Sequence, residues 1–355
     1  MKSNFSANND TQLNVFSEEA YITIGSTWFS DGFYLFMVLP WTIINVFLNG
    51  ITFLVINKMT VKPSTKKLYV YLKIYVLVCG LLSLVGTTMF ITFSPRYMPF
   101  GLNFFARLWR CQVKTPILLL LHFYTYILDI LIIIERLSQF SSESSRIFIR
   151  KYSPYKLSVI ALIFCVIVNM PINFWYDIGS DEKFFQEARE KPDKITYCSL
   201  AEFITSPIGS ILSIIMLTIS DILTLILEMI LNIVLIFFYV KFLKKKSQVV
   251  SHQNGTTTRT NHKLFSSSEI NLFLMIIFLS LISFTSHTCT AFSTFYLLGF
   301  KSDGVSLSTN MLITSFISTF KYFSNFFVLI IFNNKFRNEF NVFFSKSVNR
   351  NVANE

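Results

Sequence analysis

The stretch that decides the fold runs from Cys111 to Arg136 and reads CQVKTPILLLLHFYTYILDILIIIER. It is a long apolar run that ends in the pair Glu135-Arg136. Arg136 follows Cys111 by 25 residues, which corresponds to about 37 Å of α-helix. Such a helix is long enough to cross a bilayer, with a cysteine at one end and an acid–arginine pair at the other.

The composition of the chain indicates that lipid is its solvent. Of 355 residues, 52% are hydrophobic, 14% are charged and 40 are Phe, whereas about a quarter of the residues in soluble domains are charged. The net charge of +11 comes mostly from Lys and Arg in short segments between apolar runs, where they act as topology signals. We therefore expect an all-α membrane protein with no nucleic-acid partner.

Seven apolar runs are long enough to cross a bilayer, for which about 20 residues are needed. In chain order they are Phe33–Asn57, Leu68–Phe93, Leu108–Leu137, Lys156–Tyr176, Ile208–Lys241, Ile270–Leu298 and Val305–Phe332. Seven spans place the two ends of the chain on opposite sides of the membrane. The chain then divides into a tail over residues 1–32, a bundle over residues 33–332 and a last segment over residues 333–355.

The distribution of basic residues predicts the orientation. Segments 58–67, 136–151, 241–263 and 335–350 are rich in Lys and Arg, whereas segment 177–194 carries mixed charge. Because basic loops stay in the cytoplasm, we expect a multi-pass protein of the plasma membrane with an extracellular N-terminus. Asn4 and Asn9, each in an Asn-x-Ser/Thr match, fall on the outer side and are expected to carry glycans.

The five cysteines fall into two groups. Cys79, Cys165 and Cys289 lie inside apolar runs, where a cysteine is most simply a small packing residue. Cys111 and Cys198 lie at the ends of runs on the predicted outer side. Because that compartment is oxidising, a disulfide bond between them is expected.

Several residues stand at spacings typical of one family. They are Asn49 in the first run, Cys111 and Cys198, Glu135-Arg136-Leu137 where an Asp/Glu-Arg-Tyr is usual, Asn325 where an Asn-Pro-x-x-Tyr begins, and Phe336 after the last run. Together they resemble the rhodopsin-like (class A) G-protein-coupled receptors. The resemblance covers about residues 33–344 and implies a seven-transmembrane helix bundle with a short C-terminal amphipathic helix.

The chain also departs from that family. Phe326 and Leu329 replace the proline and tyrosine of the seventh-helix motif, an apolar residue near Val76 replaces an acid, and the sixth run has no Trp-x-Pro. These departures argue against a sodium site of the usual kind and leave open whether the seventh-helix motif still switches. The stretch Val168-Asn169-Met170-Pro171 is similar to invertebrate FMRFamide-type neuropeptide receptors.

Two ionisable residues lie deep in the predicted membrane, where each costs about 2.5 to 3.5 kcal/mol on insertion scales. Asp129 precedes Arg136 by two helical turns, and Lys321 precedes Asn325 by one. Our hypothesis is that Lys321 takes the place of the sodium ion and pairs with Asp129, in an intramembrane polar network that includes Asn49. The alternative is that Lys321 faces a water-filled cavity alone.

The inner end of the third run has a role that the resemblance implies. There Glu135 and Arg136 form a lock that holds the resting state, and its release lets Arg136 face a G protein, with Asn325 as a second switch residue. The alternative is an ordinary ion pair at the water boundary.

A ligand pocket is expected to open outward between the third, fifth, sixth and seventh runs. Its candidate lining residues are His122, Tyr126, Glu228, His287, Phe295 and Tyr296. The alternative is that each histidine is a hydrogen-bonded packing residue. Asp221, seven residues before Glu228, shares its helical face.

These observations predict a receptor that binds an extracellular ligand, a neuropeptide or other small chemical signal, and activates a heterotrimeric G protein. Its further partners are membrane lipids. No nucleotide loop, metal-ligand cluster or nucleophile triad is visible, so neither enzymatic activity nor a cofactor is expected. A small multi-span transporter or channel is the alternative, as is a receptor-like protein that no longer couples. A transporter usually shows an inverted repeat or paired broken helices, and neither is visible here.

Overall fold

The structure is a computed structural model that describes residues 34–61, 63–88, 104–140, 152–174, 176–177, 199–253, 267–299 and 304–352. Within these ranges the chain is almost entirely helical. The first half contains η1 (Tyr34–Val38), α2 (Leu39–Lys58), η2 (Pro63–Thr65), α3 (Lys66–Thr87), α4 (Phe104–Leu108), η5 (Trp109–Lys114), α5 (Thr115–Phe140), α7 (Pro154–Asn169) and η6 (Met170–Phe174). The second half contains α9 (Glu202–Thr205), α10 (Pro207–Leu217), η7 (Thr218–Leu223), α11 (Thr224–Gln253), α12 (Ser267–Gly299), α13 (Gly304–Phe332) and α14 (Asn334–Val352). In the described part, the one pair of strands is β1 (Tyr176–Asp177), antiparallel to β2 (Ser199–Leu200).

Six helical spans in the described residues are long and apolar enough to cross a membrane. They are Phe36–Lys58, Lys66–Thr87, Cys111–Ser138, Pro154–Phe174, Pro207–Lys241 and Ile270–Ser293. A further stretch, Phe316–Phe332, reaches the required length and apolarity only when it is joined to Asn334–Ser345, from which it is bent by 99°. By length and composition, the described residues thus contain six candidate spans, or seven if this bent pair counts as one span. This number indicates a multi-pass membrane protein.

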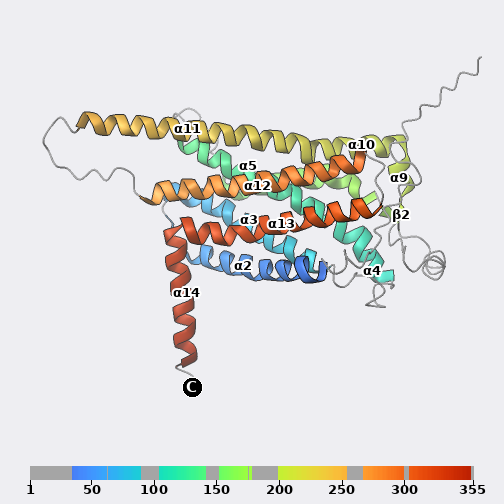
Figure 1. The fold of residues 1–355 in the computed structure, drawn as a ribbon, viewed down its shortest axis with the longest axis horizontal. Coiled ribbons are helices and arrows are strands. Elements are labelled where there is room, and N and C mark those ends of the chain that lie inside the picture. Colours follow the sequence, from blue (N-terminus) through green and yellow to red (C-terminus); the bar gives the residue numbers. More distant parts are fainter. Residues whose placement is uncertain are drawn as a thin grey trace, which may run out of the picture.

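The long helices lie side by side as one elongated bundle, and α14 leaves it almost at a right angle (Figure 1). The helix α5 has a central place, because it packs against α3, α7, α11 and α12. The helices α7 and α10 lie at the rim and expose large apolar side chains such as Ile163, Ile167 and Ile208. Such a surface is suited to lipid, since an exposed apolar face of this extent is rare on soluble monomers.

Local sequence signals account for several helix starts. Proline occupies the first turn of α7 and α10, where its missing N–H costs no hydrogen bond. Ser206 caps α10 by accepting a hydrogen bond from the Gly209 amide at 3.1 Å. A Cβ at Gly209 would lie 1.8 Å from the Phe203 carbonyl oxygen, so only glycine fits this close approach.

The turn from α13 into α14 is built on Asn333. Its Oδ1 accepts a hydrogen bond from the Phe336 amide at 3.1 Å, which is the N-cap interaction that starts a helix. Its Nδ2 donates to the Tyr69 hydroxyl of α3 at 2.8 Å. Phe336 is fully buried and lies edge-on to Phe326 of α13. The expected helix after the bundle is therefore present, although with 19 residues it is longer than the short helix that the sequence predicts.

Candidate functional site

The span that contains α5 has the predicted disulfide cysteine at one end and two of the predicted switch residues at the other. Cys111 lies in the π-helix η5 at one end, is buried and is disulfide-bonded. Its predicted partner Cys198 lies outside the described residues. Glu135 and Arg136 lie at the other end of α5, where they are 7% and 5% exposed. The predicted continuous span from Cys111 to Arg136 is present, with its first turns wound as a π-helix rather than an α-helix.

An ion pair joins α5 to α13 in the middle of the bundle. The Lys321 Nζ atom donates to the Asp129 Oδ2 atom at 3.1 Å, and both side chains are almost completely buried. Ser283 of α12 donates a hydrogen bond to the same oxygen. The pairing proposed from the sequence is thus the contact that the structure contains, and α12 takes part in it as well.

Aromatic rings surround the lysine of this pair. The Nζ atom lies 4.4 Å from the ring centroid of Tyr126, 5.8 Å from that of Tyr75 and 6.0 Å from that of Tyr322. An ammonium group over an aromatic face is attracted by the ring quadrupole, more strongly where water is absent. These rings therefore help to hold a cation that the membrane interior would otherwise exclude.

A second buried pair joins α11 to α12. The Glu228 Oε2 atom lies 3.1 Å from the His287 Nδ1 atom, and neither side chain is exposed to solvent. The His287 ring stacks on the Tyr126 ring, with centroids 3.7 Å apart and planes 9° apart. Because Lys321 also lies over Tyr126, this ring of α5 connects the two pairs. We refer to Tyr126, Asp129, Glu228, Ser283, His287 and Lys321 as the polar junction.

The network extends from the polar junction to α2. The Tyr322 hydroxyl lies 2.8 Å from the His122 Nδ1 atom. The Asn49 Nδ2 atom donates to the Asn45 carbonyl at 2.9 Å and contacts the Tyr322 carbonyl at 3.4 Å. Asn45 in turn donates to the Thr319 carbonyl at 2.8 Å. Asn49 thus lies in the same network as Lys321, through the backbone of α13 rather than by direct contact.

Four of the six predicted ligand-binding residues come together in this region. Tyr126, Glu228 and His287 are buried, and His122 is half-buried beside them. His287 contacts both Tyr126 and Glu228, whereas His122 contacts Tyr322. These contacts agree with the alternative of hydrogen-bonded packing residues, and the residues belong to the helices between which a pocket was expected. Phe295 and Tyr296 lie in α12, but their side chains are outside the described set. Asn4 and Asn9 also lie outside the described residues.

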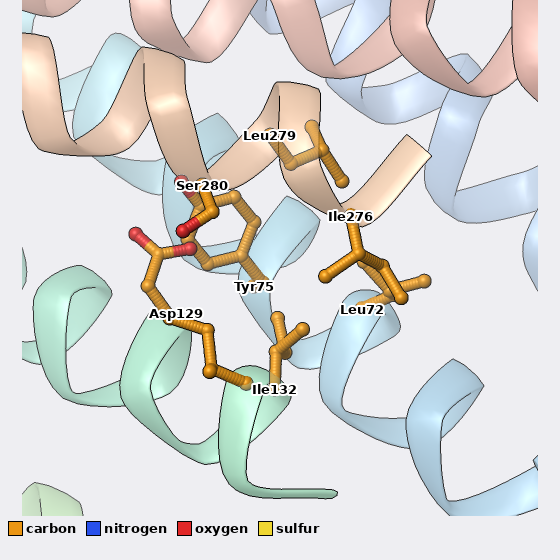
Figure 2. A pocket seen from close by; sticks show the side chains of 8 residues that line it. Leu72, Tyr75, Asp129, Ile132, Ile276, Leu279 and Ser280 are labelled. Atoms are coloured by element: carbon orange, nitrogen blue, oxygen red, sulfur yellow. The ribbon is translucent and has the colours of Figure 1, made fainter. Parts of the chain in front are cut away.

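A small cavity lies next to the polar junction. Its walls are Leu72, Tyr75, Asp129, Ile132, Ile133, Ile276, Leu279 and Ser280, from α3, α5 and α12 (Figure 2). The volume open to the centre of a water molecule is about 10 Å³. This space is far below the several hundred Å³ of a drug-sized ligand site.

The remaining predicted residues lie nearer the end of the bundle from which α14 leaves, which we call the inner end because the sequence predicts that it faces the cytoplasm. The Asn325 Nδ2 atom donates to the Cys79 Sγ atom of α3 at 3.6 Å. Phe326 and Leu329, which replace the usual proline and tyrosine, belong to the apolar core. Lys73 bonds to Asn57 and lies over the Phe53 ring at 5.3 Å, as expected for a lysine that reaches toward the membrane surface.

Sequence reasoning missed the polar face of α12. Ser280, Ser283 and His287 are buried, and Thr290 accepts a hydrogen bond from the Tyr126 hydroxyl at 3.4 Å. Their spacing of three, four and three residues puts all four on one helical face. That spacing was readable in the sequence and would have predicted that this face contacts the charges of α5 and α11. The contact between Asn333 and Tyr69 had no comparable signal, since it depends on the bend after α13.

No protein-family model matches the chain, and no curated protein matches it. In the described part of the chain, no group of three or more His, Cys, Asp or Glu side chains is placed to hold a metal ion.

Proposed function

We propose that this chain is a seven-helix receptor of the rhodopsin-like class, in the plasma membrane with its N-terminus outside. In this proposal α13 is the seventh span, and α14 lies along the inner membrane surface. The receptor binds an extracellular ligand, a neuropeptide or other small chemical signal, and activates a heterotrimeric G protein.

The observation that carries the proposal is the arrangement along α5. One apolar span has a disulfide-bonded cysteine at one end and a buried Glu135-Arg136 pair at the other. A disulfide bond at the outer end and a buried arginine at the inner end are the features expected of a helix that transmits a signal across the membrane. The placement of Glu135 and Arg136 has no rationale in a transporter.

The polar junction supplies the second argument. It joins α5 to α13 through Asp129 and Lys321, and α11 to α12 through Glu228 and His287. A ligand can shift a conformational equilibrium only if it binds one arrangement better than the other. A ligand that enters among the outer halves of these helices, and favours a different arrangement of the junction, would move the inner ends where Arg136 lies.

The proposal is tested in cultured cells by measuring ligand-independent activation of each main Gα class. The receptor is compared with Arg136→Ala and with Lys156→Ala, which removes an exposed cation at the start of α7. We expect basal activation of at least one Gα class by the natural chain and by Lys156→Ala, and its loss in Arg136→Ala at equal surface expression.

Two results would contradict the proposal. Basal activity that survives in Arg136→Ala would remove the assigned role of that residue. If none of the three proteins activates any Gα class, either alone or with a library of neuropeptides, the chain is a receptor-like protein that no longer couples or a transporter. Measurement of solute flux then tests the transporter.

A further inference from the structure

The cavity beside the polar junction lies where α3, α5 and α12 meet (Figure 2). Its lining residues Ile132 and Ile133 follow Asp129 along α5, so the cavity lies on the Arg136 side of that residue. Five of its eight lining residues are aliphatic, and the other three are Tyr75, Asp129 and Ser280. Figure 2 shows the carboxylate of Asp129 beside the hydroxyl of Ser280 and the ring of Tyr75. One side of the cavity is therefore polar and the other apolar.

The polar side has hydrogen-bonding capacity that its protein neighbours do not use. The hydrogen bonds that Asp129 accepts from Lys321 and Ser283 both end on its Oδ2 atom, so its Oδ1 atom can accept a further hydrogen bond. Ser280 donates its own proton to the Asn232 Oδ1 atom of α11, which leaves the lone pairs of its oxygen as acceptors. A carboxylate oxygen in the membrane interior without a donor is costly.

We propose that this cavity binds one water molecule, which donates hydrogen bonds to Asp129 Oδ1 and to Ser280 Oγ. The volume of about 10 Å³ matches the space that one water requires, and a buried water is held by two to four polar partners. The phenol of Tyr75 is the third polar group at the wall. The water joins α5 to α12, with α3 beside them, and bridges of this kind are nearly as favourable as direct hydrogen bonds.

A metal cation is a poorer occupant than water. The Lys321 Nζ atom already lies 3.1 Å from the Asp129 carboxylate and supplies its counter-charge. A second cation at this site would be repelled by the lysine. Hard cations also need several oxygen ligands, whereas most of this wall is aliphatic. The inference concerns the packing of the bundle and holds whether or not the protein couples to a G protein.

The first test uses the sign of a stability change in the purified full-length protein. Ser280→Thr keeps the hydroxyl and adds one methyl group, which can enter the space that the water molecule would occupy. If the cavity holds water, the methyl group displaces it and leaves Asp129 Oδ1 without a donor. The Tm is then expected to fall by roughly 2 to 4 °C. If the cavity is dry, the methyl group fills a void, and a rise in Tm would overturn the proposal.

The second test separates water from sodium and from overpacking. Tm is measured in sodium chloride and in N-methylglucamine chloride at equal ionic strength, and no difference is expected. Stabilisation by sodium alone would overturn the proposal. A structure at a resolution that shows ordered water is expected to contain a peak about 2.8 Å from both Asp129 and Ser280 oxygens. Absence of that peak would also overturn it, whatever the Tm of Ser280→Thr.

Discussion

The middle of the bundle and its inner end are held together by different forces. In the middle, charged and polar side chains of α5, α11, α12 and α13 contact one another directly in the polar junction. At the inner end, Phe326, Phe336 and Phe340 pack ring against ring, and Asn333 provides a hydrogen bond to α3.

This difference indicates that the contacts in the middle of the bundle depend on particular partners, whereas the packing at its inner end can rearrange. A buried ion pair adds little net stability over well-packed apolar residues, but loss of one partner is severe because a buried charge is left alone. Packed phenylalanines tolerate rearrangement, since dispersion and burial have no direction. A bundle that switches would exchange one set of discrete contacts in the middle for another, and its phenylalanine-rich end would repack in response.

The largest effect is expected from the Asp129–Lys321 pair. Either Asp129→Asn or Lys321→Met leaves one buried charge without its partner and should cost about 3 to 5 kcal/mol. The double mutant should recover much of this loss. Surface expression and thermal unfolding of the purified protein measure it, with Lys73→Met as the control lysine near the membrane boundary. A double mutant no better than either single mutant would contradict the pairing.

A smaller effect is expected from the second buried pair. His287→Phe keeps a ring to stack on Tyr126 but leaves Glu228 without its partner, which should cost about 1 to 3 kcal/mol. Adding Glu228→Leu should restore most of the stability. If His287→Phe alone is as stable as the natural chain, the contact between Glu228 and His287 does not stabilise the fold.

At the inner end, the Asn333 contacts should matter less than either buried pair. Asn333→Ala removes both the cap of α14 and the bond to Tyr69, and should cost about 1 to 2 kcal/mol. Tyr69→Phe removes only the second bond and should cost about 1 kcal/mol or less. Thermal unfolding compares the two variants. A larger loss in Tyr69→Phe than in Asn333→Ala would show that the cap contributes nothing.

The smallest effect is expected where α14 meets α2. The Lys58 Nζ atom lies 4.6 Å from the centroid of the Phe343 ring, a cation–π contact worth about 0.5 to 1 kcal/mol at an exposed site. Phe343→Leu and Lys58→Gln should each lose about that amount, and the double mutant should lose no more than either. Strictly additive losses in this cycle would mean that the two side chains do not interact.

The sequence predicted six of the apolar spans and the Asp129–Lys321 contact, because both follow from strong physical constraints. An apolar run of membrane length must be helical, and a buried lysine and a buried aspartate on neighbouring helices have strong reason to pair. The start of the fifth span was predicted within one residue, at Ile208 against Pro207 in the structure.

Other features depended on local geometry that the sequence does not specify. The π-helices η5 and η7 change which residues face the interior, and no residue pattern indicated them. The stack of His287 on Tyr126 depends on how far α12 is shifted along α5. The small size of the cavity depends on how closely the aliphatic side chains of three helices pack, which no single segment determines.

The most direct test of the proposed function is nucleotide exchange on purified G-protein heterotrimers by the purified chain in lipid vesicles. We expect exchange above that of empty vesicles, loss of this activity in Arg136→Ala, and its retention in Lys156→Ala. Vesicles that show no exchange with any heterotrimer, with or without candidate peptides, but become permeable to a solute would contradict the account and identify a transporter or channel instead.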